Sequence, residues 1–218
     1  MAAMEPAYLV GEYAHDLEHS LCADPVLVAI RSFMTHLERC ATPSQIARVR
    51  YEVMYLFMAM AGEATWRINQ TTPPTWEYLA QRQGNGFLAN ISLIDVVGGY
   101  EVPANLYYSP AVRKATVLAS NVTVYANDLY SAPKESMTAL VAYNMPGLIA
   151  GERPCTLQEG LDRSAAIHDD TVRAYESVER DLLRDDVSPL LRRYLEGVRA
   201  WIGGNAHWHA TSGRYRID

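Results

Sequence analysis

Apolar residues recur at helical spacing along nearly the whole chain, whereas the alternating pattern of a half-buried strand is almost absent. Several helical stretches open with a capping side chain followed by proline, as Asp24 precedes Pro25 and Thr42 precedes Pro43. These start and stop signals predict about seven or eight helices. The pattern therefore indicates a single all-α bundle over residues 1–218.

The boundaries of the expected helices follow from these signals. They are residues 24–40, 42–69, 72–100 with a break at 84–86, 109–136, 137–145, 156–184 and 188–210. No internal repeat, low-complexity segment or linker separates them, so one domain is expected.

The composition is that of an ordinary globular protein: 49% of the 218 residues are apolar and 20% are charged. The formal net charge is −6 and no basic stripe is present, which argues against nucleic acid as the main partner. The three cysteines, Cys22, Cys40 and Cys155, are too far apart to form a disulfide framework. We therefore expect a cytoplasmic protein whose cysteines are small apolar core residues.

Nothing in the sequence predicts a membrane span or a signal peptide. The stretch "MYLFMAMAGEATW" is apolar, but Glu63 and Arg67 end the run well short of the length that a span needs. A buried core helix is the expectation for this stretch. Residues 1–21 lack the basic region followed by an apolar run that is typical of a signal peptide.

Three oxygen-bearing side chains stand four residues apart in "YANDLYSAPKES", residues 125–136: Asn127, Ser131 and Glu135. A step of four residues turns a helix by only about 40° from the starting face, so these side chains project along one stripe. Amide, hydroxyl and carboxylate oxygens are hard donors that suit Mg²⁺, and Lys134 beside them suits a phosphate bound to that metal. The alternative interpretation is a solvated polar helix face.

The stretch "NDLYSAPKE" resembles the Asn/Ser/Glu metal-binding motif of the class I terpene synthases. The resemblance implies that this motif lies on one wall of a helical cavity and holds one of three magnesium ions that grip an isoprenoid diphosphate. Glu63 and Trp66, at the end of "FMAMAGEATW", extend the similarity. The chain as a whole is most similar to the bacterial 2-methylisoborneol synthases.

An upstream segment, "AQRQGNGF", also resembles this family. Arg82, Asn85 and Gly86 match its diphosphate sensor, its linker and its effector residue at a helix break. Glycine suits such a break because it frees the backbone and gives access to the carbonyl. The resemblance therefore implies catalytic roles for these three residues.

The C-terminal segment "WHATSGRYRID" completes the resemblance. Arg214 and Tyr215 match the family's Arg-Tyr pair, whose donors would close over the diphosphate. Trp208 matches a cavity tryptophan that would stabilise a carbocation through its aromatic face. Weaker candidates for the same role are Tyr55, Phe57 and Phe87.

The family's second metal motif, an Asp-rich stretch upstream of the arginine sensor, is not found. The stretches "IHDDTVRAY" and "LLRDDVSP" follow the Asn/Ser/Glu motif and are interpreted as surface charge. The stretch "AHDLEH" has one aspartate, Asp16, with His15, Glu18 and His19, and is interpreted as a solvated face. By family spacing, the Asp-rich helix would fall before Met1. We therefore expect the C-terminal two-thirds of a terpene synthase domain, without its N-terminal helices and with one Mg²⁺ in place of three.

Two further details of the sequence carry expectations. Pro133 lies inside the motif and lacks an N–H, so a kink that swings Glu135 is expected. His207 and His209 are two residues apart and point to different faces of a helix, so surface or capping roles are expected for both.

The resemblance implies a magnesium-dependent cyclase of bacterial secondary metabolism. Arg82, Lys134, Arg214 and Tyr215 would stabilise the leaving group when an allylic diphosphate ionises. Closure of the site would exclude water and protect the carbocation. For 2-methylisoborneol synthases the substrate would be 2-methylgeranyl diphosphate, and water would quench the final cation.

Several alternatives remain open at this point. One is a cyclase with another monoterpene or sesquiterpene product. Others are a truncated, catalytically incompetent fragment, or one half of a split cyclase whose partner chain supplies the Asp-rich helix. An isoprenoid-diphosphate-binding protein or prenyltransferase fits less well, because that family uses two Asp-rich motifs. The expected ligand is an allylic isoprenoid diphosphate, with neither nucleic acid nor membrane as a partner, and a homodimer is compatible with the sequence.

Overall fold

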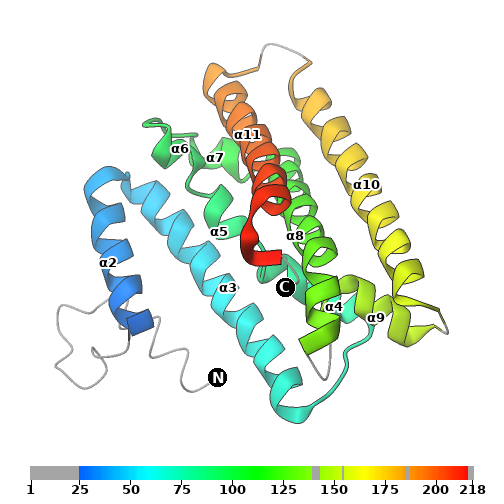
Figure 1. Cartoon of the computed structure of the whole chain (residues 1–218). Coiled ribbons are helices and arrows are strands. Elements are labelled where there is room, and N and C mark those ends of the chain that lie inside the picture. Colours follow the sequence, from blue (N-terminus) through cyan, green and yellow to red (C-terminus); the bar gives the residue numbers. More distant parts are fainter. Residues whose placement is uncertain (1–24, 139–142, 154, 185–186, 216–218) are drawn as a thin grey trace.

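The computed structural model describes residues 25–138, 143–153, 155–184 and 187–215, and in these ranges it contains helices and no strand. Long helices lie side by side in a bundle, with shorter helices toward both of its ends (Figure 1). The elements are α2 Pro25–Cys40, α3 Pro43–Asn69, α4 Thr75–Gly84, α5 Leu88–Ile91, α6 Ile94–Val97, α7 Ala104–Tyr107, α8 Pro110–Thr138, α9 Met145–Glu152, α10 Leu157–Leu182, α11 Pro189–Thr211 and the 3₁₀ helix η1 Gly213–Tyr215.

Helix α8 is the centre of the bundle and packs against α9, α10 and α11. Around its first half lies the larger apolar core, which consists of Ile91, Val102, Tyr107, Val112, Ala115, Ala119, Tyr175, Leu191, Tyr194, Leu195 and Val198. Around its second half lies a smaller core, which consists of Tyr78, Val124, Tyr125, Met145, Leu148 and Ile149. This second core fixes α4 and α9 against the part of α8 that carries the oxygen-donor column.

The start signals that the sequence predicts act as real caps. The hydroxyl of Thr42 accepts the N–H of Gln45, and the Gln45 side chain accepts the N–H of Thr42, so a full capping box opens α3. Thr156 and Glu159 form the same box at the start of α10. These caps satisfy backbone donors that no intrahelical carbonyl can reach, which places the helix starts where the sequence predicted them.

Helix α8 continues through Pro133 to Thr138, so proline does not end the motif helix. The prediction of one helix over residues 137–145 is wrong in part: Met137 and Thr138 end α8 and Met145 begins α9, but Asn144 is extended and outside any helix. Its side-chain oxygen accepts the N–H of Gly147 and caps α9, with Pro146 in the first turn. An asparagine cap followed by proline is a helix start, which the apolar run before it concealed.

The expected continuation of the helix after the break at 84–86 is replaced by two short helices, α5 and α6. Between them the hydroxyl of Ser92 donates to the Ala89 carbonyl, a local bond that competes with the helical ladder. Buried Asp95 accepts bonds from Arg48 and from the Val102 N–H, which bends the chain back toward α3. Long-range polar contacts therefore override the local helical pattern.

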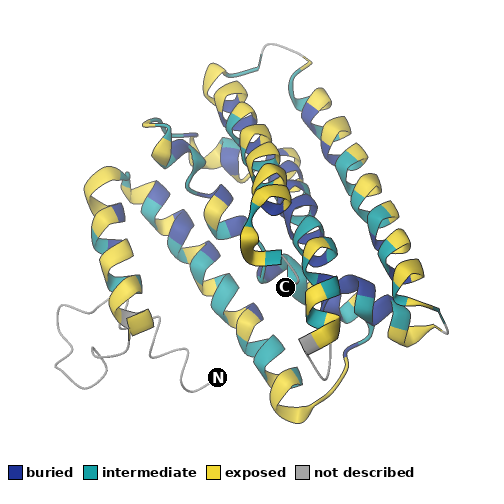
Figure 2. Ribbon diagram, in the orientation of Figure 1, coloured by how far each residue is buried: buried dark blue, intermediate teal, exposed yellow. Residues whose placement is uncertain are grey.

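Two expectations about burial are also wrong. Cys40 is exposed and Cys155 is only half-buried, so neither is a core residue, and Cys22 lies outside the described residues. The apolar run on α3 is not a buried core helix: Met58 is 65% exposed, and Met54 and Met60 are exposed as well (Figure 2). In the part of the chain that the structure describes, no helix is long and apolar enough to cross a membrane.

Candidate active site

Three separate parts of the chain meet at the side chain of Asn127 on α8. From α4, the Nη2 of Arg82 donates to Asn127 Oδ1 at 3.0 Å. From the C-terminal end, the Nδ2 of Asn127 donates to the Tyr215 hydroxyl at 2.9 Å and lies 3.2 Å from the Nε2 of His209. The fold therefore brings Arg82 and Tyr215, two residues of the predicted diphosphate site, into contact with the same side chain, Asn127.

Arg82 is held in place by a buried carboxylate, Asp128. Its Nε and Nη2 donate to Asp128 Oδ1 at 3.1 and 2.9 Å, and the other oxygen of Asp128 accepts the Tyr78 hydroxyl and the Met145 N–H. Burial alone would lower the pKa of Arg82, but the Asp128 carboxylate and the nearby Tyr78 and Glu63 raise the pKa above its usual value. Burial raises the pKa of Asp128, and these four bonds oppose that rise.

The helix break lies where the sequence predicted it. Helix α4 ends at Gly84 and α5 begins at Leu88, and the Asn85 carbonyl accepts Nη1 of Arg82 at 2.9 Å. The Asn85 side chain donates to Glu63 on α3. Gly86 does not have a positive φ, so it does not supply an unusual backbone angle, and its access to the carbonyl stays a prediction; a Cβ there would lie 2.9 Å from the Ser120 hydroxyl. Glycine is needed for close packing against α8 and not for an unusual backbone angle.

The other two members of the oxygen-donor column have fewer partners. Among the described residues, Ser131 Oγ makes one long bond of 3.5 Å, to the Asp128 carbonyl of its own helix. One oxygen of Glu135 accepts the Asn144 Nδ2 at 2.7 Å. Tyr215, which bonds Asn127, also has its pKa raised, by burial first and by the Glu135 charge to a smaller extent. Asn127 bonds the C-terminal segment directly, whereas Glu135 bonds Asn144, the cap residue of α9.

Two basic residues flank this column. Lys134 Nζ donates to the backbone carbonyl of Arg214 at 3.0 Å, which ties the end of α8 to η1. The Arg214 guanidinium is exposed and lies 5.9 Å from the centre of the Tyr215 ring. Both positive groups are therefore next to the column and reachable from solvent.

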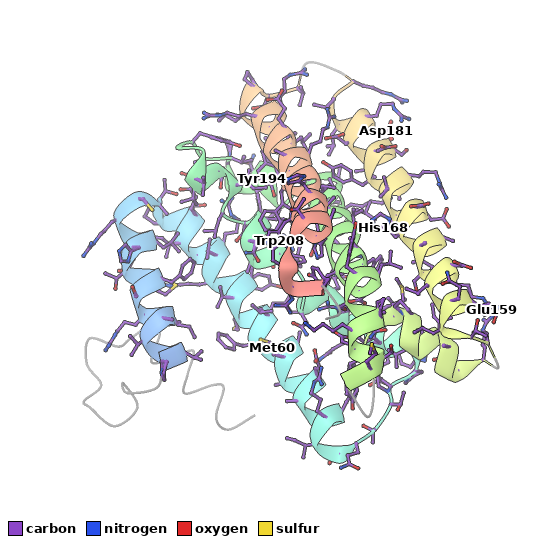
Figure 3. All side chains as sticks on the ribbon, viewed as in Figure 1. Met60, Glu159, His168, Asp181, Tyr194 and Trp208 are labelled. Carbon is purple, nitrogen blue, oxygen red and sulfur yellow. The ribbon has the colours of Figure 1, made fainter. Side chains whose placement is uncertain are left out.

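An apolar pocket of about 380 Å³ adjoins the site, and it is lined by Phe87, Ala200, Trp201, Gly204, Asn205 and Trp208. The rings of Phe87 and Trp201 are 5.7 Å apart. Trp208, near the C-terminal end of α11, is 48% exposed (Figure 3). The predicted cavity aromatics Trp208 and Phe87 line this pocket, whereas Tyr55 and Phe57 are not among its lining residues.

The comparison with known families decides the identity. Residues 7–174 match the family described as terpene synthase family 2, C-terminal metal binding. The chain belongs to this terpene synthase family. The resemblance to class I terpene synthases and the all-α fold, both predicted from the sequence, are thereby confirmed.

Individual terpene synthases are similar over almost all of this chain. The 2-methylisoborneol synthase of Streptomyces griseus is 39% identical over 216 residues, which cover 99% of this chain and 49% of the relative. Bonnadiene synthase of Allokutzneria albata is 31% identical over 89% of this chain and 54% of its own length. The crystal structure of Streptomyces coelicolor 2-methylisoborneol synthase with Mg²⁺ and 2-fluoroneryl diphosphate matches with a TM-score of 0.91 and 31% identity, over 100% of this chain and 69% of that chain. The chain spans about half the length of the curated relatives it matches.

The oxygen-donor column has suitable chemistry for one Mg²⁺. Asn127 Oδ1, Ser131 Oγ and the Glu135 carboxylate are hard oxygen donors on one helix. Ser131 has only its weak local bond, and one Glu135 oxygen has no hydrogen-bond partner among the described residues, so both could accept a ligand. Within the described ranges no group of three or more His, Cys, Asp and Glu is placed to hold a metal. The "AHDLEH" stretch lies outside the described residues.

Sequence reasoning missed His209, for which it expected a surface or capping role. His209 is 2% exposed, contacts Asn127 and stacks on the Tyr215 ring with centroids 5.3 Å apart, whereas His207 is exposed as expected. A signal was present: His209 continues, at steps of three or four residues, the inward-facing stripe of α11 that consists of Tyr194, Val198, Ile202 and Asn205. The pair-wise spacing of the two histidines concealed this longer period.

Proposed function

We propose that this chain carries the diphosphate-binding part of a magnesium-dependent terpene cyclase. One observation supports the proposal most directly: the Asn127 amide joins the arginine of the helix break to the tyrosine of the C-terminal pair. Residues more than 80 positions apart in the chain, Asn127 with His209 and Tyr215, thereby form one polar cluster. A solvated helix face does not explain this convergence.

Asn127, Ser131 and Glu135 would hold the metal, and Mg²⁺ would neutralise negative charge on the diphosphate. The four donors Arg82, Lys134, Arg214 and Tyr215 would bind the phosphate oxygens as charge develops on them. The bond between the allylic carbon and the diphosphate oxygen then breaks, with the electron pair leaving on oxygen. Arg82 is the best-oriented donor because Asp128 and Asn85 fix three of its nitrogens.

The apolar pocket would receive the hydrocarbon part of the substrate. The faces of Trp208, Trp201 and Phe87 would stabilise a carbocation by cation–π attraction and exclude water from it. Addition of one water molecule to the last cation, with loss of a proton, would give an alcohol. The substrate that we propose is 2-methylgeranyl diphosphate and the product 2-methylisoborneol, because the similar enzymes of Streptomyces carry that name.

We propose one Mg²⁺ for the residues present, and that residues 1–218 correspond to the C-terminal two-thirds of a class I domain. The exposed methionines of α3 support this domain assignment, since a soluble bundle rarely leaves such a face uncovered. They also favour a second candidate: a chain that binds diphosphate but needs further helices, in its own longer chain or a partner chain, for turnover.

The test is incubation with Mg²⁺ and either geranyl or 2-methylgeranyl diphosphate, with products identified by mass spectrometry. It is made on this chain and on the longer chain that any in-frame upstream codons encode. Formation of 2-methylisoborneol, lost in Asn127→Ala, supports the full proposal, and a different terpene from either substrate overturns the substrate assignment. Magnesium-dependent binding of inorganic diphosphate without turnover supports the second candidate. If the chain shows no turnover and no such binding, both candidate functions are overturned.

A further inference from the structure

His209 is the one residue of the Asn127 cluster for which the proposed function gives no role. Its ring is buried, stacks on Tyr215 and lies 5.5 Å from the centre of the Tyr130 ring. The Nδ1 atom lies 2.7 Å from the backbone carbonyl of Asn205, and the Nε2 atom lies 3.2 Å from Asn127 Nδ2. Both ring nitrogens are therefore engaged, each by a different kind of group.

These two contacts fix the tautomer of His209. A carbonyl oxygen can only accept, so Nδ1 must carry the hydrogen. The Nε2 atom faces the NH₂ of Asn127, because the Oδ1 of the same amide accepts from Arg82, and Nε2 is therefore a bare acceptor. The ring consequently accepts an N–H from Asn127 and cannot donate to it.

The tautomer and Arg82 together select the direction of the Asn127 carboxamide. We propose that His209 is a positioning residue that keeps the NH₂ of Asn127 toward α11 and its Oδ1 toward Arg82 and the ligand side. The guanidinium of Arg82 is a pure donor and requires the same direction. Reversing the amide would place its NH₂ against Arg82 and its oxygen against the lone pair of Nε2, so two contacts would become repulsive at once.

The importance of this orientation for catalysis rests on the proposed function, because only Oδ1 can bind a cation. Without His209, the Asn127 amide keeps Arg82 and Tyr215 but loses one of the contacts that select its direction. Partners behind a metal ligand commonly contribute about ten- to a hundredfold in metal affinity. His209 is therefore expected to act on the magnesium-dependent affinity of the site without touching the metal.

The first measurement is ¹⁵N NMR of the histidine rings in the metal-free chain, with His209 identified by its loss in His209→Gln. The expected ring is neutral with hydrogen on Nδ1, the less common tautomer of histidine in water. A hydrogen on Nε2 would overturn the proposal. This measurement needs no metal and no substrate, so it stands whether or not the proposed function is correct.

The second measurement is the affinity for inorganic diphosphate in the presence and absence of Mg²⁺. His209→Phe keeps a buried ring but has no acceptor, and its magnesium-dependent affinity is expected to fall about tenfold. His209→Gln places an amide oxygen near the Nε2 position and is expected to recover most of this loss. His207→Phe, two residues away on the exposed side of α11, is the matched control and should match the parent chain.

Each outcome has a distinct meaning. Equal affinities for the parent chain and His209→Phe, or a glutamine variant as weak as phenylalanine, overturn the positioning role. If Asn127→Ala itself leaves the magnesium-dependent affinity unchanged, the metal role in the proposed function fails, and the tautomer alone decides the orientation. If His209→Phe does not fold by circular dichroism, the tautomer of the parent chain and the affinity of the glutamine variant still support or overturn the positioning role.

Discussion

The two ends of α8 each lie against a buried arginine that pairs with an aspartate, but the two polar clusters are built differently. The first cluster, at the start of α8, consists of Arg48, Glu52, Asp95 and Arg113. The site cluster, near its end, consists of Arg82, Asn127, Asp128 and His209. Both contain an arginine–aspartate pair, so the groups around that pair show what separates a structural ion pair from a candidate binding site.

The Arg48–Asp95 pair of the first cluster is closed to solvent, whereas its second arginine, Arg113, is 23% exposed. Arg48 is 3% exposed, bonds Asp95 and the Ser92 carbonyl, and stacks at 4.1 Å on the Tyr107 ring. In the site cluster, the Arg82 side chain is 16% exposed and divides its donors between Asp128, Asn127 and the Asn85 carbonyl. A guanidinium that is anchored by a carboxylate, yet still shares a donor with exchangeable neutral groups, is suited to bind an anion.

The largest expected effect is the loss of the carboxylate in the first cluster. Asp95→Asn leaves the Arg48 charge buried without its counter-charge, so the free energy of unfolding should fall by about 3 kcal/mol in urea denaturation. The control is Asp170→Asn, in the exposed pair with Arg173. This variant should change the free energy of unfolding by less than about 0.5 kcal/mol. The diphosphate affinity of the folded Asp95→Asn protein should be unchanged, and a loss there would mean that the first cluster also serves the site.

Replacing the buried arginine of each cluster by lysine should distinguish the two clusters by their effect on diphosphate affinity. Arg82→Lys keeps the charge but cannot reach Asp128, Asn127 and Asn85 together, so the magnesium-dependent affinity for diphosphate should fall about a hundredfold, or about 2.7 kcal/mol. Arg48→Lys should lower stability but leave that affinity unaltered. Equal losses of affinity in the two lysine variants, measured by calorimetry on folded protein, would remove the distinction between the clusters.

The sequence predicted much of the fold through local signals. The capping box of Thr42 and the proline in the next position are read within four residues, and the helix of the oxygen-donor column follows from its own periodicity. The break around Gly86 was also placed correctly, although close packing against Ser120 was not foreseen as its cause. Signals that act within one or two helical turns can therefore be recognised from the sequence alone.

Contacts across the chain were out of reach because they depend on how distant helices dock. Asp128 was visible as the neighbour of Asn127, but its bond to an arginine 46 positions away is set by the docking of α4. The α9 start at Asn144 was concealed by an apolar run, and His209 by the short spacing to His207. The family motif supplied the residues of the candidate site, whereas only the tertiary structure shows which groups hold them in place.

A smaller and more local effect is expected from Asn127 itself. Asn127→Ala removes one oxygen donor of the column and leaves Asp128 to hold Arg82, so the magnesium-dependent affinity should fall about thirtyfold, or about 2 kcal/mol. Asn121→Ala is the control on the same helix, because its Oδ1 has no hydrogen-bond partner among the described residues. An equal loss in Asn121→Ala, measured by the same titration, would show that α8 acts through its packing and not through the column.

The smallest effect should come from the lysines, of which the chain has Lys114 and Lys134, one at each end of α8. Lys134 donates to the Arg214 carbonyl at the site, whereas Lys114 is exposed beside the first cluster. Because an exposed charge is screened, Lys134→Met should weaken diphosphate binding by less than about fivefold at low salt. The difference should vanish at high salt, and Lys114→Met should show none at either salt. A Lys134 effect that persists in high salt would mean that its ammonium contacts the phosphate inside the water-excluding part of the site, and the site cluster would then contain two cations, Arg82 and Lys134, and not one.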